Sequence, residues 1–248
     1  MSYLDCNECH GTNVAGARPC PACGPERRLV GAKVPEAFLS CTREAWEASF
    51  GPWEKHSQLK KLVNWPSSDP ADWLVMVYGE FGVGKSSLTT ALFSQALEWA
   101  DRTFTSEQKR GQPRSLWIDF NDWVDEMMAA FGNEGESDRI YLRARDAFIL
   151  HIDDGGIIRG AEDPKKGAFW RQRTALLIRH RYNHRLRTIW NNNLISRETA
   201  ERLRKPYTKM QLYPDGFEVI DGSLVGRMTT HLAIELTGGD LRKKKALK

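Results

Sequence analysis

Residues 73–92 read WLVMVYGEFGVGKSSLTTAL, and this stretch decides the fold. A buried-type apolar run is followed by the pattern G-x-x-x-x-G-K-S and then by the apolar periodicity of a helix. Gly79, Gly82 and Gly84 permit positive φ angles and a close backbone approach, so successive N–H groups can surround a phosphate. The helix that begins near Lys85 directs the positive end of its dipole at the same anion. The stretch therefore predicts a phosphate-binding loop between a strand and a helix.

The same motif predicts that these phosphates belong to ATP held together with Mg²⁺. Lys85 is expected to reach the β- and γ-phosphates, and the Ser86 hydroxyl is expected to ligate Mg²⁺. A chance glycine-rich turn is the weaker interpretation, because the full motif stands in its strand–turn–helix context. The residues expected to bind the nucleotide are Gly79, Glu80, Phe81, Gly82, Val83, Gly84, Lys85, Ser86 and Ser87.

Two adjacent acids follow a second apolar run. Residues 147–154 read AFILHIDD, a buried-type strand that ends in Asp153 and Asp154. Ligand groups are expected at the carboxyl ends of parallel strands, so Asp153 is expected to face Mg²⁺. Asp154 could orient or deprotonate the attacking water. The alternative is an Asp-Gly turn, because IDDGG is also good turn chemistry, but the preceding loop favours the metal site.

A third strand is expected to end in amides. Residues 187–195 read RTIWNNNLI, a short apolar run followed by Asn191, Asn192 and Asn193. An amide beside the acidic strand could contact the γ-phosphate or position the water, although asparagine runs are also ordinary loop material. The residues alone leave open which of the three acts.

Short apolar runs alternate with longer amphipathic ones from about residue 71 onward. This alternation predicts βαβ crossovers and an α/β fold with a parallel sheet covered on both faces. The expected strands are 73–78, 115–119, 147–152, 188–190 and 231–236. The expected helices are 84–99, 121–131, 167–185 and 196–204.

Four of the five cysteines fall within the first 23 residues. Cys6-x-x-Cys9 and Cys20-x-x-Cys23 have the spacing of two zinc knuckles, which predicts a structural Zn²⁺ site with four thiolate ligands. Such a short segment cannot bury an apolar core, so metal binding would supply its folding free energy. Coincidental cysteines or a redox pair are weaker interpretations, and Cys41 is expected to be a buried thiol.

The chain length of 248 residues suits one full domain with a small appendage. We expect a zinc-binding module at 1–28, a linker and helical lead-in at 29–70, and the ATPase core at 71–248. No apolar run approaches the ~20 residues that span a membrane, and the first residues lack the apolar segment of a signal peptide. A cytoplasmic protein is expected. The net charge of +4 is too small to establish nucleic-acid binding.

Taken in order, these motifs resemble those of the AAA+ ATPases of the DnaC/DnaI helicase-loader and IstB group. The resemblance runs from about residue 29 to about residue 236 and ends on LVGRMTTHLAIEL at 224–236. It implies an AAA+ P-loop NTPase core with a five-stranded parallel sheet and an absent or reduced lid subdomain. It also points to a bacterial or phage protein.

The resemblance implies two further catalytic residues. Asn193 falls on the sensor-1 amide, with Asn192 as the neighbour that could serve instead. Arg227 falls on the arginine that reaches the ATP site of the next subunit, which implies a homo-oligomer formed on ATP binding. With Lys85 and Asp154 they complete the expected catalytic set. The chain departs from the group in reading NNN for T-S-N and in having Ser223 where a second arginine is common.

The function implied by the resemblance is ATP-dependent loading of a replicative DNA helicase, with slow ATP hydrolysis that DNA or the partner stimulates. Single-stranded DNA is a further expected partner, because residues 171–188 are dense in arginine around Tyr182, although a solvated helix would look similar. The zinc module could dock on protein or on nucleic acid. The alternatives are an IstB-like regulator of a transposase on duplex DNA, a nucleotide kinase, and a zinc adaptor with a decayed ATP site.

Overall fold

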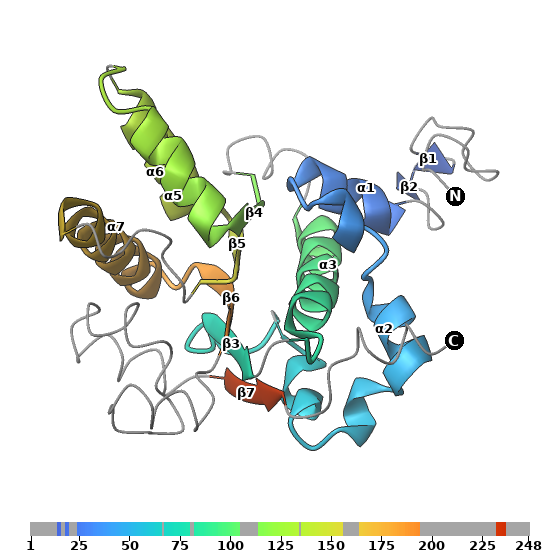
Figure 1. The fold of residues 1–248 in the computed structure, drawn as a ribbon. Helices are drawn as coiled ribbons and strands as arrows, with labels where there is room; N and C mark the ends of the chain where they lie inside the picture. Colours follow the sequence, from blue (N-terminus) through green and yellow to red (C-terminus); the bar gives the residue numbers. More distant parts are fainter. Residues whose placement is uncertain are drawn as a thin grey trace, which may run out of the picture.

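Five parallel strands form the central sheet, in the order β4-β5-β6-β3-β7 (Figure 1). The computed structural model describes residues 14–15, 18–19, 24–65, 67–79, 82–104, 114–133, 135–155, 164–193 and 232–236. The strands are β3 Leu74–Gly79, β4 Leu116–Asp119, β5 Ile149–Asp153, β6 Arg187–Asn193 and β7 Leu232–Leu236. All five predicted strands and their parallel arrangement are confirmed.

The carboxyl ends of three strands meet at one edge of the sheet. β3 lies between β6 and β7, with Leu74 opposite Thr188 and Gly79 opposite Asn193. On its other side β6 pairs with β5, in which Ile152 lies opposite Trp190. After β3 the chain continues to β4 at the far end of the sheet, while β3 itself pairs with β6 and β7, so the strand order reverses beside β3. Open α/β sheets bind ligands at such switch points. The glycine loop, the acidic pair and the asparagines are thereby brought to one place.

The sheet is buried on both faces because its strands alternate side chains between two layers of helices. Leu74 and Met76 face α5 (Phe120–Ala129), α6 (Glu136–Asp146) and α7 (Pro164–Asn183). Val75 and Val77 face α3 (Lys85–Thr103), so the molecule has three layers (Figure 1).

The predicted helices following the glycine loop and the second and third strands are confirmed as α3, α5 and α7. The sequence did not predict α6. Its inward face consists of Ile140, Tyr141 and Ala144, while Leu142 is exposed, so its apolar pattern is weak. The predicted helix at 196–204 lies outside the described residues.

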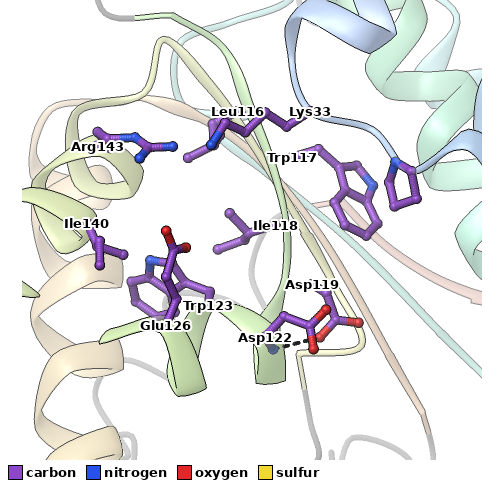
Figure 2. Close-up of a pocket in the computed structure, with 11 residues that line it drawn as sticks. Lys33, Leu116, Trp117, Ile118, Asp119, Asp122, Trp123, Glu126, Ile140 and Arg143 are labelled. Atoms are coloured by element: carbon purple, nitrogen blue, oxygen red, sulfur yellow. Dashed lines mark hydrogen bonds between the residues drawn. The ribbon is translucent and has the colours of Figure 1, made fainter. Parts of the chain in front are cut away.

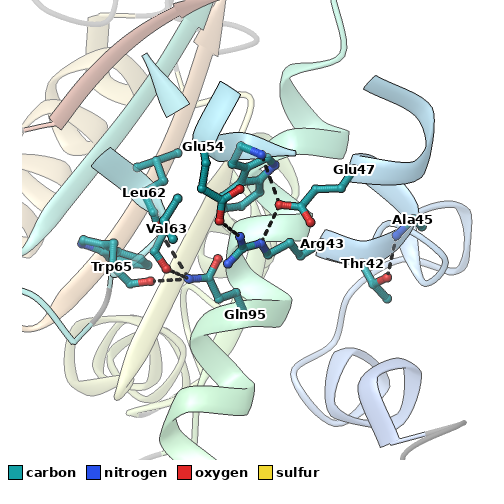
Figure 3. Close-up of polar contacts among 10 residues, drawn as sticks. Thr42, Arg43, Ala45, Glu47, Glu54, Leu62, Val63, Trp65 and Gln95 are labelled. Carbon is teal, nitrogen blue, oxygen red and sulfur yellow. Dashed lines mark hydrogen bonds and ion pairs between the residues drawn. The ribbon is translucent and has the colours of Figure 1, made fainter. Parts of the chain in front are cut away.

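The lead-in packs directly on α3. It contains α1 Gly24–Gly31, η2 Glu36–Phe38, α2 Arg43–Phe50, η3 Trp53–Lys55 and η4 Leu59–Leu62. Leu62 and Trp65 are fully buried in the same apolar cluster as the α3 side chains, and each such residue stabilises the fold by about 1.5–3 kcal/mol before entropy is counted. Gln95 of α3 donates to the carbonyls of Val63 (2.7 Å) and Trp65 (2.9 Å), as Figure 3 shows.

Ion pairs hold the outer part of the lead-in together. The Arg43 guanidinium contacts the carboxylates of Glu47 at 2.8 Å and Glu54 at 3.0 Å (Figure 3). Cys41 lies between η2 and α2 and is partly exposed. The expectation that Cys41 is a buried thiol is therefore wrong, because the turn that carries it runs along the surface of the lead-in.

A short antiparallel pair, β1 Val14–Ala15 with β2 Arg18–Pro19, lies in the sequence between the two cysteine pairs. Cys6, Cys9, Cys20 and Cys23 lie outside the described residues. Among the helices that the structure does describe, none combines the length and apolar character that crossing a bilayer demands.

Candidate nucleotide-binding site

The glycine loop runs from the end of β3 to the start of α3. Gly82 and Gly84 have φ angles of 78° and 91°, which favour glycine because a Cβ would be strained there. Gly79 is constrained by a close approach instead: a Cβ would lie 2.3 Å from the carbonyl oxygen of Leu236 in β7. Of the nucleotide-binding residues expected from the motif, Glu80 and Phe81 lie outside the described residues.

The first turn of α3 presents the charged and hydroxyl groups of the motif. Lys85 is its first residue and is 7% exposed. Ser86 and Ser87 follow it and are partly exposed, as is Val83, two residues before Lys85. The Ser86 hydroxyl donates to Asp153 Oδ1 over 2.9 Å. A helix of this length directs a positive dipole at the loop, so the turn favours an anion next to an oxygen pair that could hold a cation.

Asp153 ends β5 and is 6% exposed. Burial raises the pKa of its carboxyl, while hydrogen bonds from Asn191 and Ser86 act in the opposite direction. A buried carboxylate beside a hydroxyl supplies the oxygen ligands that Mg²⁺ prefers, and the cation would favour the charged form. Ser86 and Asp153 therefore have the chemistry that a magnesium ion requires, and their role as its ligands stays a prediction.

Asp154 takes an unusual backbone conformation next to Asp153. Its φ angle is 52°, in the left-handed region that few residues other than glycine, asparagine and aspartate adopt. Its N–H donates to Asn191 Oδ1 over 2.8 Å, and the next N–H, of Gly155, donates to the Asn191 carbonyl over 3.0 Å. The turn after β5 is thus fastened to β6.

The asparagines of β6 lie on opposite faces of the sheet. Asn191 faces α3, where its amide contacts Asp153, while Asn192 is fully buried on the other face with Trp190. Asn193 lies opposite Gly79 at the end of the ladder, and its side chain is outside the described part of the chain. The resemblance pointed to Asn193 or Asn192 and missed the contact of Asn191. Strand alternation could have found it, because Asn191 shares a face with the buried Ile189.

The arginine-dense stretch does not form one continuous basic surface. Arg181 is fully buried, and Arg187 is 9% exposed and donates to the carbonyls of residues 68, 69 and 72. Arg173 pairs with Asp138 over 2.9 Å. Arg179 and Arg185 are the exposed arginines among those whose side chains the structure describes here. Only part of the stretch is therefore available to a nucleic acid.

The buried Arg181 guanidinium donates hydrogen bonds to five acceptors. Its guanidinium donates to the Thr188 hydroxyl at 2.8 Å and to the carbonyls of residues 144, 145, 147 and 187 at 2.6–3.2 Å. Burial lowers the pKa of Arg181 to about 9. This arginine fastens α7 to the end of α6 and the start of β6 and has a structural role.

A pocket of about 280 Å³ lies apart from this site, at the outer edge of β4 (Figure 2). Lys33 and Arg143 lie at one end and Asp119 and Asp122 at the other, over an apolar floor that includes Trp123. The Asp119 carboxylate already accepts from the Asp122 N–H at the start of α5. None of the predicted nucleotide-binding residues lines this pocket.

Within the described ranges, no three His, Cys, Asp or Glu side chains are grouped so that they could hold a metal ion. The predicted zinc ligands Cys6, Cys9, Cys20 and Cys23 and the predicted finger Arg227 lie outside those ranges.

Comparison with solved structures finds proteins with a similar fold. A structure of the DnaC helicase loader matches with a TM-score of 0.54 and 17% identity, over 82% of this chain and 100% of that one. AMPPCP-bound DnaA from Aquifex aeolicus matches with a TM-score of 0.52 at 14% identity, over 84% of this chain and 54% of that one. Replication initiator DnaA bound to AMPPCP and single-stranded DNA matches with a TM-score of 0.53 at 14% identity, over 86% and 55%.

The chain spans about half the length of the two DnaA structures. Neither a protein-family model nor the sequence of a curated protein matches the chain. These likenesses show the fold: the chain has the α/β architecture of the DnaC and DnaA structures, with the parallel five-stranded sheet that its sequence predicted.

Proposed function

We propose that this protein is an ATPase that loads a replicative DNA helicase and uses ATP as its assembly switch. The observation that carries the proposal is the contact of Ser86, in the first turn of α3 after the glycine loop, with Asp153 at the end of β5. It occurs in a fold that matches a structure of the DnaC helicase loader over 100% of that structure's chain. The site supports the ATPase, and the likeness together with the motif order supports the loader.

In the proposed site, the phosphates lie on the glycine loop and against Lys85. Ser86 and Asp153 hold Mg²⁺, which would neutralise charge on the phosphates and orient them. Asp154 orients or deprotonates the attacking water, and its fixed turn keeps its carboxylate close to the metal ligand. Asn193 and Arg227 complete the catalytic set by resemblance, with Arg227 supplied by a neighbouring subunit. ATP binding is thereby coupled to assembly of a homo-oligomer.

Asp154→Asn is expected to bind ATP with nearly unchanged affinity while its hydrolysis rate falls by about 100-fold or more, because the general base is lost. Asparagine tolerates a positive φ angle, so the turn is kept. Equilibrium binding and phosphate release measure the two quantities. Asp125→Asn, on the exposed face of α5, is the control and should hydrolyse ATP normally. Normal turnover by Asp154→Asn would remove this residue from catalysis.

The N-terminal cysteines are proposed to bind one structural Zn²⁺ through Cys6, Cys9, Cys20 and Cys23. The support is their paired spacing, which suits tetrahedral thiolate coordination. Metal analysis of the purified protein is expected to find about one zinc per chain, since all four ligands are needed for a closed site. Cys20→Ser should lose the metal and Cys41→Ser should keep it. Equal zinc content in these two variants would contradict the proposal.

Single-stranded DNA is proposed as a second partner of the loader. Arg179 and Arg185 at the end of α7 are exposed and could contact a phosphate backbone. A DnaA of the same fold has been solved with single-stranded DNA.

Co-purification from the host tests the loader function directly. The tagged chain is expected to bring a hexameric replicative helicase with it when ATP is present. Lys85→Ala removes the expected phosphate contact. The helicase should then no longer be recovered with the tagged chain, or its recovery should no longer depend on ATP. Recovery of a transposase in place of the helicase would contradict the proposal and favour the IstB-like alternative.

A further inference from the structure

A single carboxamide joins the glycine-loop helix to the acidic turn. Asn191 Nδ2 donates to Asp153 Oδ1 and, over 3.0 Å, to the Thr89 hydroxyl, and it lies 3.5 Å from Ser86 Oγ. At its other end, Asn191 Oδ1 accepts from the Asp154 N–H over 2.8 Å. One side chain of β6 therefore contacts α3 and both acids at the end of β5.

The contacts of Asn191 have a consistent direction. The Thr89 hydroxyl donates to the Lys85 carbonyl over 3.0 Å, which leaves its oxygen to accept from Asn191. The Asp153 carboxylate can only accept when it is ionised, so the amide N–H₂ must face it and the amide oxygen must face the Asp154 N–H. Opposite ends of the same planar amide thus contact the two acids, the N–H₂ group at the Asp153 carboxylate and the oxygen at the Asp154 N–H.

The hydrogen bonds of Asn191 offset the cost of burying its amide. Asn191 is 1% exposed, and a buried amide is costly unless both of its ends are bonded. His151 on β5 faces the same side of the sheet at 0% exposure, yet neither of its ring nitrogens has a hydrogen-bond partner in the described structure. It packs against Phe93 and Trp117 as an aromatic residue. Buried polar groups on this face are therefore not all bonded, and the bonds of Asn191 are specific to the acidic pair.

We propose that Asn191 is a positioning residue for the magnesium site, which orients the Asp153 carboxylate beside Ser86 while it fixes the Asp154 backbone. This inference rests on the proposed ATPase function. Asp154 has a φ angle of 52°, and such a conformation persists only where the surroundings hold it. Two bonds to Asn191 stabilise this conformation. Its side-chain oxygen accepts from the Asp154 N–H, and its backbone carbonyl accepts from the Gly155 N–H. The side-chain amide of Asn192, on the opposite face of β6, has no hydrogen-bond partner in the described structure.

Asn191→Leu and Asn191→Ala test the proposal through the dependence of nucleotide binding and hydrolysis on Mg²⁺ concentration. Groups that orient metal ligands typically contribute about 10–100-fold to metal affinity, so the half-saturating Mg²⁺ concentration should rise at least about 10-fold in both variants. ATP binding measured in EDTA should stay within about two-fold of the wild type, because the glycine loop and Lys85 are intact. If the leucine variant does not fold, the Mg²⁺ dependence of the smaller alanine variant tests the proposal.

His151→Phe is the matched control. It also replaces a fully buried polar side chain on this face, one strand away, and should leave the Mg²⁺ dependence unchanged. A purely structural Asn191 would lower the melting temperature without moving the Mg²⁺ dependence, and that result in a folded variant would overturn the inference. If the wild type itself shows no effect of Mg²⁺ on ATP binding, the proposed magnesium site fails and the inference falls with it.

Discussion

Lys85→Ala is expected to lose ATP binding, with a rise of at least about 100-fold in the dissociation constant, or roughly 2.7 kcal/mol. Lys85 is the first residue of α3 and lies directly after Gly84 of the loop. Its ammonium group is expected to make charge-assisted hydrogen bonds to the β- and γ-phosphates, and such bonds contribute about 1.5–3 kcal/mol each. Titration with a fluorescent ATP analogue measures the loss.

Two further variants make this result interpretable. Lys85 is 7% exposed, so its removal could also disturb packing. Lys85→Met keeps the aliphatic stem and should lose ATP binding just as strongly, while the unfolding temperature stays near that of the wild type. Lys60→Ala changes an exposed lysine of η4 and should bind ATP normally. Unchanged ATP affinity in Lys85→Ala would remove this loop from nucleotide binding.

Arg181→Met is expected to lower the free energy of unfolding by at least about 3 kcal/mol, since each buried polar group that loses its partner costs about 1–3 kcal/mol. Arg181 satisfies four backbone carbonyls and the Thr188 hydroxyl at the junction of α6, α7 and β6. Methionine fills similar space but donates no hydrogen bond. Relief from burying a charge offsets part of the loss, and the several orphaned acceptors outweigh it.

Denaturant unfolding of matched variants measures this effect. Arg179→Met changes an exposed arginine two residues earlier on the same helix and should shift the free energy of unfolding by no more than about 0.5 kcal/mol. Arg181→Lys keeps the charge but cannot reach all the acceptors, and should fall between the wild type and Arg181→Met. Equal stability of Arg181→Met and Arg179→Met would contradict the structural role of Arg181.

The strands could be predicted because their signal is local. The apolar run of β3 and the glycine loop after it indicate a strand that turns into a helix. The length of β6 was underestimated, because asparagine is rare in strands. Asn191 and Asn192 nevertheless pair with Val77 and Tyr78 through their backbones, which extends the ladder to the site.

Parts of the site depend on contacts between distant segments. The sequence identified Ser86 and Asp153, whose roles follow from motifs, and the structure brings them together. It did not identify the contact of Asn191, because the resemblance directed attention to the last asparagine of the run. Arg181 looks like a surface charge in a basic stretch. Its burial is seen only in the structure, where the carbonyls of α6 and β6 accept hydrogen bonds from it.

Calorimetric titration of the wild-type protein with ATP, in Mg²⁺ and again in EDTA, tests the central claim of a Mg²⁺–ATP site most directly. The geometry of Lys85, Ser86 and Asp153 predicts saturable binding of one nucleotide per chain, with an affinity that Mg²⁺ raises. No saturable binding at millimolar ATP, or the same affinity with and without Mg²⁺, would contradict it.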